Sequence, residues 1–164
     1  MNVLLWLSNT APAVWARESE SIWAYPTILF LHTFGLGLLV GFTAVVDLRV
    51  LGFSPSLPLA PLRRFFRYIW IGFWINAASG TVLLIMAPAK LANPAFIVKM
   101  TCITIGVVNM LWLKREAFGR RADAEDPGPP GVSALSRGLA ASSLALWTVA
   151  ITAGRLMAYV GAQR

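Results

Sequence analysis

Residues 21–46 read SIWAYPTILFLHTFGLGLLVGFTAVV, and none of them is an acidic or basic residue other than a single histidine. A helix needs about 20 residues to cross the roughly 30 Å hydrocarbon core of a bilayer, so this stretch is long enough to span a membrane. Three further apolar stretches follow it. The sequence therefore predicts an all-α fold, an integral membrane four-helix bundle that forms one domain over residues 1–164. The expected spans lie at about residues 22–46, 68–87, 94–113 and 138–160.

The composition excludes most soluble classes of protein. Of the 164 residues, 57% are hydrophobic and 13% are charged, and that charged share is about half the usual one for a soluble domain. A soluble fold of this length could not bury so much apolar surface. The single cysteine, Cys102, also excludes an intrachain disulfide and a cysteine-based zinc site.

The basic residues predict the direction of the spans. The net charge is +7, and most of the lysines and arginines fall in the loops at residues 47–67 and 114–137. The connection between the second and third spans holds only Lys90. By the positive-inside rule, the two basic loops are cytoplasmic and both termini face outward. This placement favours membrane lipids as partners and argues against nucleic acid.

Residues 1–20 precede the first span and contain no basic residue before Arg17. A cleaved signal peptide begins with basic residues, so we do not expect one here. Trp6 and Trp15 are typical of a membrane–water interface. We therefore interpret this segment as a short N-terminal interfacial helix that lies on the membrane surface.

Three ionisable side chains fall inside the expected spans: His32, Lys99 and Arg155. Such groups are costly in hydrocarbon, so each is a candidate for function. At 1.5 Å per residue, His32 lies roughly 15 Å below the outer surface, and the two cations lie roughly 7 to 8 Å below it. All three are expected in the outer half of the bilayer, with the imidazole close to the midplane.

An imidazole beneath two cations matches the shape of haem b. The iron of a haem takes a histidine nitrogen, and its two propionates favour cations. We predict that His32 is the axial metal ligand and that Lys99 and Arg155 bind the propionates, with a methionine such as Met100 as a second ligand. Polar residues that share helix faces with these groups complete the predicted cofactor site: Asn76, Asn109 and Thr152.

Other cofactors and structural roles stay open for the same residues. A quinone-like cofactor suits the same cations. Copper would need the first three spans to converge on the outer side and bring together Met86, Met100, Cys102 and His32. His32 alternatively forms hydrogen bonds across the bundle to Asn76, Ser79 or Thr152. Lysine and arginine at this depth alternatively extend their charged ends to the lipid head groups.

Two further features have structural interpretations. Gly37-x-x-x-Gly41 lies inside a span with no strand before it, so we expect close helix packing there and no nucleotide-binding loop. Asp47 lies at the cytoplasmic end of the first span. We expect it to cap that helix or to pair with a loop arginine.

Four motifs in the chain resemble those of an uncharacterised family of small bacterial four-helix inner-membrane proteins. They are LHTFGLGLLVGFTAVVDLRVLG (31–52), SGTVLLIMA (79–87), NPAFIVKM (93–100) and NMLWL (109–113). The matching positions are His32, Gly35, Gly41, Asp47, Arg49, Gly52, Gly80, Asn93, Phe96, Lys99 and Asn109. That family looks distantly similar to copper-resistance-D-type membrane domains and to four-helix b-type cytochromes. The resemblance implies the fold and a bacterial inner membrane, in which both termini would be periplasmic, but no settled activity. The lack of further histidines argues against a two-haem relay.

We expect the chain to be an electron-transfer subunit that binds a cofactor, haem b first, and passes electrons to a periplasmic redox partner. The first alternative is a non-catalytic accessory or scaffold subunit, within a homo-oligomer or a larger membrane complex. The second is a copper-handling membrane protein. The sequence has no metalloprotease motif, phosphate loop or embedded carboxylate pair, so a redox or accessory role is expected rather than an enzymatic one.

Overall fold

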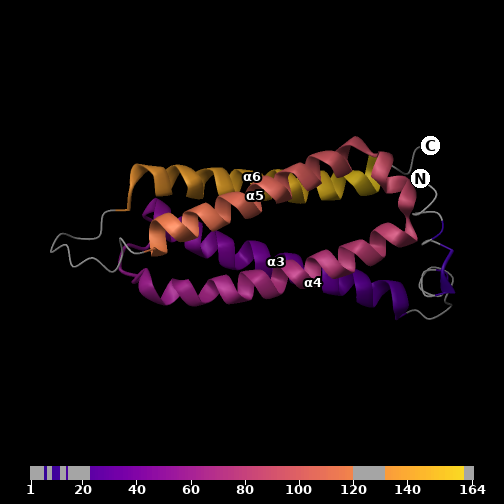
Figure 1. The fold of residues 1–164 in the computed structure, drawn as a ribbon, viewed down its shortest axis with the longest axis horizontal. Coiled ribbons are helices and arrows are strands. Elements are labelled where there is room, and N and C mark those ends of the chain that lie inside the picture. Colours follow the sequence, from indigo (N-terminus) through magenta and orange to yellow (C-terminus); the bar gives the residue numbers. More distant parts are fainter. Residues whose placement is uncertain (1–5, 7–8, 12–13, 15–22, 120–131, 161–164) are drawn as a thin grey trace.

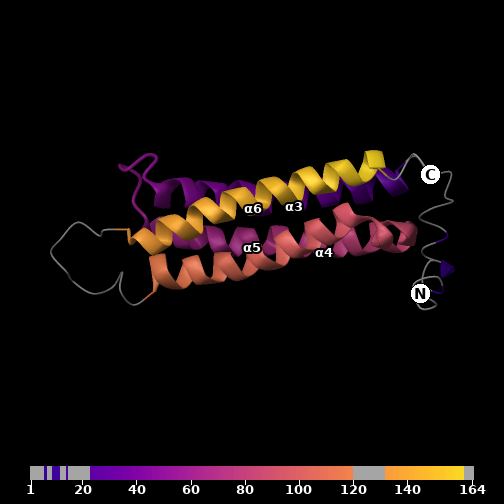
Figure 2. The same ribbon diagram turned by 90° about the horizontal axis from the view of Figure 1, so that it is seen from above.

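The computed structural model describes residues 6, 9–11, 14, 23–119 and 132–160. Its four long helices run side by side in an elongated bundle, as Figures 1 and 2 show. Each is long and apolar enough to cross a membrane, as expected of a multi-pass membrane protein, so the predicted all-α four-helix bundle is confirmed. In chain order the elements are α3 (Ala24–Leu51), η1 (Ala60–Arg64), α4 (Phe65–Met86), η2 (Pro88–Ala92), α5 (Pro94–Phe118) and α6 (Ala134–Val160).

All four helices extend further into the basic loops than the sequence predicted, and α4 begins at Phe65 instead of residue 68. α3 continues past residue 46 to Leu51, α5 continues past residue 113 to Phe118, and α6 begins at Ala134. The prediction placed the limits of the spans at the charged residues. A charge does not end a helix, because lysine and arginine are good helix formers whose long side chains reach water from an apolar end.

Local capping sets the end of α3 and the start of α5, and of these two the start of α5 lies where the sequence predicted it. Gly52 ends α3 with a φ of 103°, a left-handed conformation that a side chain disfavours. The N–H of Phe53 then donates to the carbonyl of Leu48 at 3.0 Å, which completes a Schellman motif. At the start of α5, the Asn93 side chain accepts from the N–H of Ala95 at 2.9 Å, and proline occupies the first helical position.

The bundle consists of two helix pairs. α3 packs along α4, α5 packs along α6, and α3 joins the pairs by packing on α6. α4 and α5 are consecutive in the chain, yet they make few contacts with each other. The two helices therefore approach each other least closely on this side of the bundle, which we call the sparse seam, and at its basic end the rings of Phe66 and Phe118 bridge it at 5.4 Å.

Glycines set the distance between α3 and α4, but not the pair that the sequence suggested. Gly37 and Gly41 are exposed, and nothing lies within 4 Å of a Cβ built on either one. The prediction that they pack closely is therefore wrong. The close approach runs through Gly35 and Gly72, both of which are buried and face the opposite helix. Close packing through a glycine of α3 does occur. The rotation of α3, however, turns Gly35 toward α4, and Gly35 lies outside the predicted Gly37-x-x-x-Gly41 motif.

Asp47 lies in the buried core at the basic end of the bundle. It is 0% exposed, and its carboxylate lies beside the buried hydroxyl of Ser143 in α6. The expected cap or arginine pair is therefore wrong for this part of the chain. The nearby Arg49 instead donates to the carbonyls of Pro55 and Leu57, which ties it to the loop after α3.

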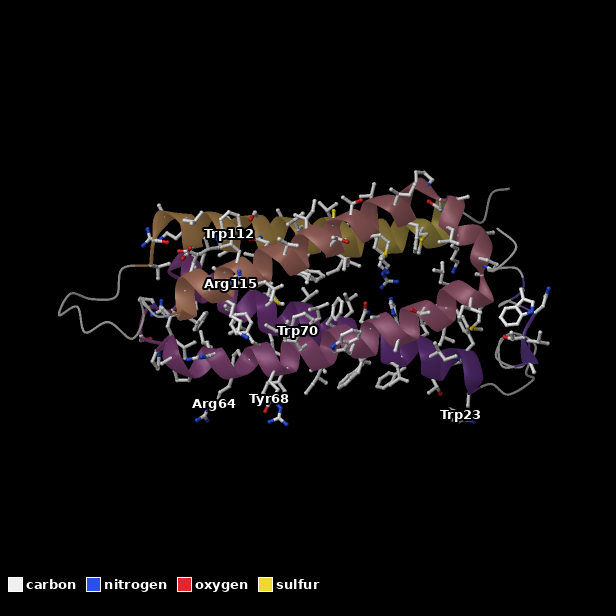
Figure 3. All side chains as sticks on the ribbon, in the orientation of Figure 1. Trp23, Arg64, Tyr68, Trp70, Trp112 and Arg115 are labelled. Carbon is white, nitrogen blue, oxygen red and sulfur yellow. The ribbon has the colours of Figure 1, made fainter. Side chains whose placement is uncertain are left out.

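The two ends of the bundle differ in their surface residues. Figure 3 shows Arg64 and Tyr68 pointing away from the bundle at one end, and Trp23 near the other. Arg63 and Arg67 are exposed at the same end as Arg64. The predicted interfacial helix at residues 1–20 lies almost wholly outside the described residues.

Candidate cofactor site

A cavity of about 200 Å³ lies between α3, α4 and α5, in the half of the bundle that is remote from the basic loops. Four residues predicted from the sequence line it together: His32, Asn76, Lys99 and Met100. α3 rises about 12 Å between Ala24 and His32. The imidazole therefore lies well inside the bundle, as expected.

The Nδ1 atom of the His32 ring is held by α4. It lies 3.1 Å from the backbone carbonyl of Asn76 and 3.2 Å from the hydroxyl of Ser79. The Asn76 amide lies 3.3 Å from the same Nδ1 and donates to the backbone carbonyl of His32 at 2.7 Å. The structural alternative for His32 is thus confirmed for Asn76 and Ser79, which fix the imidazole against α4.

These contacts favour one protonation form of the neutral ring. The Ser79 hydroxyl donates to the carbonyl of Ile75 at 2.6 Å, so its lone pairs are free to accept from His32. With the Asn76 carbonyl as the other acceptor, Nδ1 is assigned as the protonated nitrogen. Among the described residues none forms a hydrogen bond with Nε2, so that nitrogen retains a lone pair for a ligand.

The sequence makes room for this ring by placing a glycine beside it. A Cβ on Gly80 would lie 3.0 Å from Cε1 and 3.3 Å from Nδ1 of His32. Asn76, Ser79 and Gly80 follow one another at helical spacing, so one face of α4 supplies both the space and the hydrogen bonds.

Lys99 approaches the same cavity from α5, and its side chain also touches α6. A Cβ on Gly154 would lie 3.6 Å from Cδ and 3.7 Å from Nζ of Lys99. The lysine is half-buried, and its carbon chain rests against the glycine. Lys99 therefore lines the cavity together with His32, while the end of its side chain lies beside Gly154 of α6.

The other predicted site residues lie elsewhere. Arg155 and Thr152 are exposed on α6 and do not line the cavity, and the Thr152 hydroxyl donates to the carbonyl of Thr148 at 2.8 Å. Asn109 is buried and joins α5 to α6, because its amide donates to the Leu139 carbonyl at 2.9 Å. α6 thus turns the glycine before Arg155 toward Lys99, and the predicted second cation points away.

No family model, curated protein or solved structure matches this chain. The resemblance to small four-helix inner-membrane proteins therefore stays a prediction. The chemistry of the cavity itself is the basis for a functional assignment.

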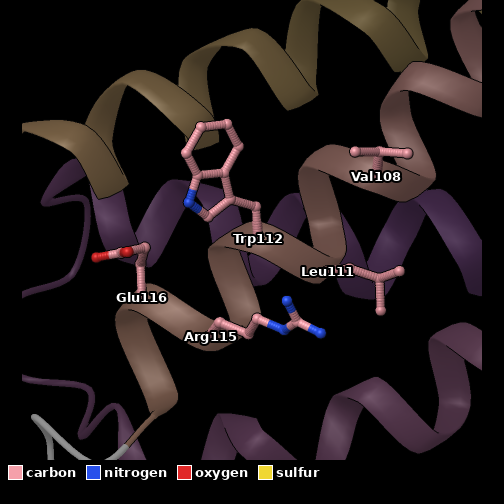
Figure 4. A pocket seen from close by; sticks show the side chains of 5 residues that line it. All are labelled: Val108, Leu111, Trp112, Arg115 and Glu116. Carbon is pink, nitrogen blue, oxygen red and sulfur yellow. The ribbon is translucent and has the colours of Figure 1, made fainter.

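A larger hollow of about 500 Å³ is less suited to a specific ligand. Among the described residues, those that line it all belong to α5, and Figure 4 shows Trp112, Arg115 and Glu116 there. Within the described part of the chain, no second helix forms an opposing wall that would enclose a ligand. The cavity at His32 is bordered by three helices and contains convergent polar groups, so it is the candidate site.

The cavity only partly fits the predicted cofactors. For haem b, His32 offers an axial nitrogen and Lys99 one cation, but about 200 Å³ is smaller than the roughly 300 to 1,000 Å³ of typical cofactor pockets. A porphyrin therefore does not fit this cavity. For copper, His32 and Met100 share the wall, while Met86 and Cys102 do not line it. Across the described ranges, no three His, Cys, Asp or Glu side chains gather into a metal site.

The sequence analysis missed the apolar walls of the cavity. They are formed by Phe73, Leu84, Phe96 and Ile103. On α5 a signal was present, since Phe96, Lys99, Met100 and Ile103 follow the i, i+3, i+4, i+7 spacing of one helix face.

Proposed function

We propose that this chain is a membrane electron-transfer subunit that holds a redox cofactor in the His32–Lys99 cavity. One observation carries the proposal. The imidazole is anchored through Nδ1 by a backbone carbonyl, its Nε2 is without a partner among the described residues, and Lys99 lines the same cavity. Proteins orient histidine ligands and proton acceptors in this way, by a hydrogen bond from the other ring nitrogen.

The proposed orientation follows from the basic residues. Arg63, Arg64 and Arg67 are exposed at the end opposite to the cavity. In a bacterial inner membrane this end would face the cytoplasm, and both termini would face the periplasm. The cavity would then lie in the periplasmic half of the bilayer, where a periplasmic redox partner could accept electrons.

The experiment determines which cofactor the purified protein carries. One preparation from native membranes is analysed by reduced-minus-oxidised absorption spectroscopy, a pyridine haemochrome assay, copper analysis and solvent extraction of quinones. We expect one redox cofactor at a defined stoichiometry, and we expect His32→Ala to lose it. Thr33→Ala is the matched control, because Thr33 is the next residue of α3 and is exposed.

Two results would contradict the proposal. A preparation that contains none of the three cofactors would do so. A cofactor content that is the same in wild type and His32→Ala would also do so, because it would place the cofactor outside this cavity. A haem found with His32 dependence would require α4 and α5 to separate around it.

A second candidate is an accessory or scaffold subunit of a larger membrane complex. The sparse seam between α4 and α5 favours it, because a helix from another subunit could pack there. Purification in mild detergent distinguishes the two candidates. A scaffold would be isolated with larger subunits and without its own cofactor, whereas an electron-transfer subunit would retain its cofactor when isolated alone.

A further inference from the structure

The candidate cavity opens toward the lipid. Thr81 of α4 and Met100 of α5 both line it, and both are exposed, Met100 to 44%. They lie on the two helices that form the sparse seam of the bundle. In a bilayer, this surface faces hydrocarbon, so a molecule dissolved in the membrane can enter the cavity from the side.

The lining of the cavity indicates an amphiphilic ligand. The polar groups of His32, Asn76 and Lys99 lie among apolar walls that include Phe73 and Phe96. A pocket of this kind selects a polar head group that is attached to an apolar body. The head group should carry oxygen atoms, because an ammonium group donates hydrogen bonds and a neutral imidazole nitrogen accepts one.

The volume of the cavity limits the size of the head group. A protein cavity of roughly 150 Å³ binds a molecule of benzene. The volume of about 200 Å³ found here therefore suits a single substituted ring. It does not suit a macrocycle.

The depth of the cavity separates a quinone from a phospholipid. The imidazole lies about 12 Å along α3 from its first residue, below the level of the head groups. Moving a charged phosphate to this depth is costly, whereas an uncharged ring is soluble in hydrocarbon.

We infer that the cavity binds the head group of an isoprenoid quinone or quinol, which enters from the bilayer between α4 and α5. This inference rests on the proposed function, since it names the class of the cofactor. The Lys99 ammonium donates to one ring oxygen, and Nε2 of His32 accepts from the hydroxyl of the reduced form. The isoprenoid chain leaves the cavity past Thr81 and Met100.

The test measures binding of decylubiquinone, in oxidised and reduced form, to the full chain in phosphatidylcholine nanodiscs by calorimetry. We expect saturable binding, and we expect Lys99→Met to weaken it about tenfold, as the loss of a charged hydrogen bond would. Met100→Trp and Thr81→Trp should each block the opening and weaken binding at least as much. Val98→Trp is the matched control, because Val98 is exposed on the same helix and does not line the cavity.

Three outcomes overturn the inference. The first is the absence of saturable binding. The second is equal affinity in the Met100→Trp, Thr81→Trp and Val98→Trp proteins. The third is Lys99-dependent displacement of the quinone by phosphatidylglycerol in the nanodisc, which would identify a lipid head group as the occupant.

The cofactor analysis and the quinone binding measurement, taken together, separate this inference from the proposed function. A haem or copper signal that depends on His32, without quinone binding, overturns the inference and leaves the electron-transfer proposal standing. Quinone binding that is unaffected by His32→Ala and Lys99→Met overturns both, because the ligand would lie outside the cavity.

Discussion

Gly35 of α3 and Gly72 of α4 lie so close together that neither can carry a side chain. A Cβ on Gly35 would lie 2.7 Å from the backbone nitrogen of Asn76 and 2.9 Å from the carbonyl oxygen of Gly72. A Cβ on Gly72 would lie 2.6 Å from the backbone nitrogen of Leu39 and 2.8 Å from the carbonyl oxygen of Gly35. Because these neighbours are backbone atoms, any side chain here would force the two helices apart.

Alanine at either glycine should therefore destabilise the bundle. For Gly35→Ala or Gly72→Ala, we expect a loss of about 1 to 3 kcal/mol in the free energy of unfolding, the usual cost of overpacking. Chemical unfolding in detergent, followed by circular dichroism, measures it. Gly37→Ala is the control, because its site is open and alanine favours the helix. Equal effects at Gly35 and Gly37 would contradict the close contact.

Gly80→Ala should affect the cofactor more than the fold. The added methyl group would lie 3.0 Å from Cε1 of His32, so the ring must move away from the Asn76 carbonyl. Loss of such an orienting hydrogen bond typically costs 10- to 100-fold in ligand affinity, and we expect a loss in that range. Cofactor retention and the ¹⁵N spectrum of the imidazole are the measurements. Gly138→Ala, at an open position of α6, should leave both unchanged.

The size of residue 154 should control the position of Lys99. Gly154→Ala places its Cβ at ordinary contact distance from the lysine chain, 3.6 Å or more, and we expect cofactor content to stay at the wild-type level. Gly154→Leu cannot be accommodated without displacing Lys99, and we expect reduced cofactor content. If the leucine variant folds and retains the full content, Lys99 is not part of the binding site.

Asp47 should be replaceable without loss of stability. Its carboxylate is fully buried beside the Ser143 hydroxyl of α6, and it has no cationic partner among the described residues. A buried carboxylate without a cation is unfavourable, and an amide can still bond to Ser143, so Asp47→Asn should leave the free energy of unfolding unchanged or raise it by about 1 to 3 kcal/mol. Denaturant titration measures the change, and Thr43→Val on the same helix face is a comparison. A marked loss of stability would show that the carboxylate has a stabilising partner.

Labelling from each side of the membrane tests the proposed orientation. In a Cys102→Ser background, Ser56→Cys should be protected from a membrane-impermeant thiol reagent in intact spheroplasts, because the loop after α3 is expected in the cytoplasm. Ala89→Cys, in the connection between α4 and α5, should react. The reverse pattern would contradict the orientation and would place the cavity in the cytoplasmic half.

Hydrophobic stretches and helix faces were readable from the sequence, whereas helix rotation was not. The spacing of Asn76, Ser79 and Gly80 predicted a polar face on α4, and the structure brings this face to His32. The choice between Gly154 and Arg155 as the neighbour of Lys99 depends on about 100° of rotation of α6. That rotation is set by packing along the whole helix, to which residues far from the site contribute.

His32 and Lys99 are carried by different helix pairs, since α3 packs on α4 and α5 packs on α6. The hydrogen bonds of the imidazole remain within the first pair, and the lysine chain rests within the second. A molecule that bonds to both groups would therefore connect the two helix pairs across the sparse seam between α4 and α5. Binding or release of this molecule would change the stability of the contact between the two helix pairs. The mechanical rigidity of the protein would then report whether the cavity is occupied.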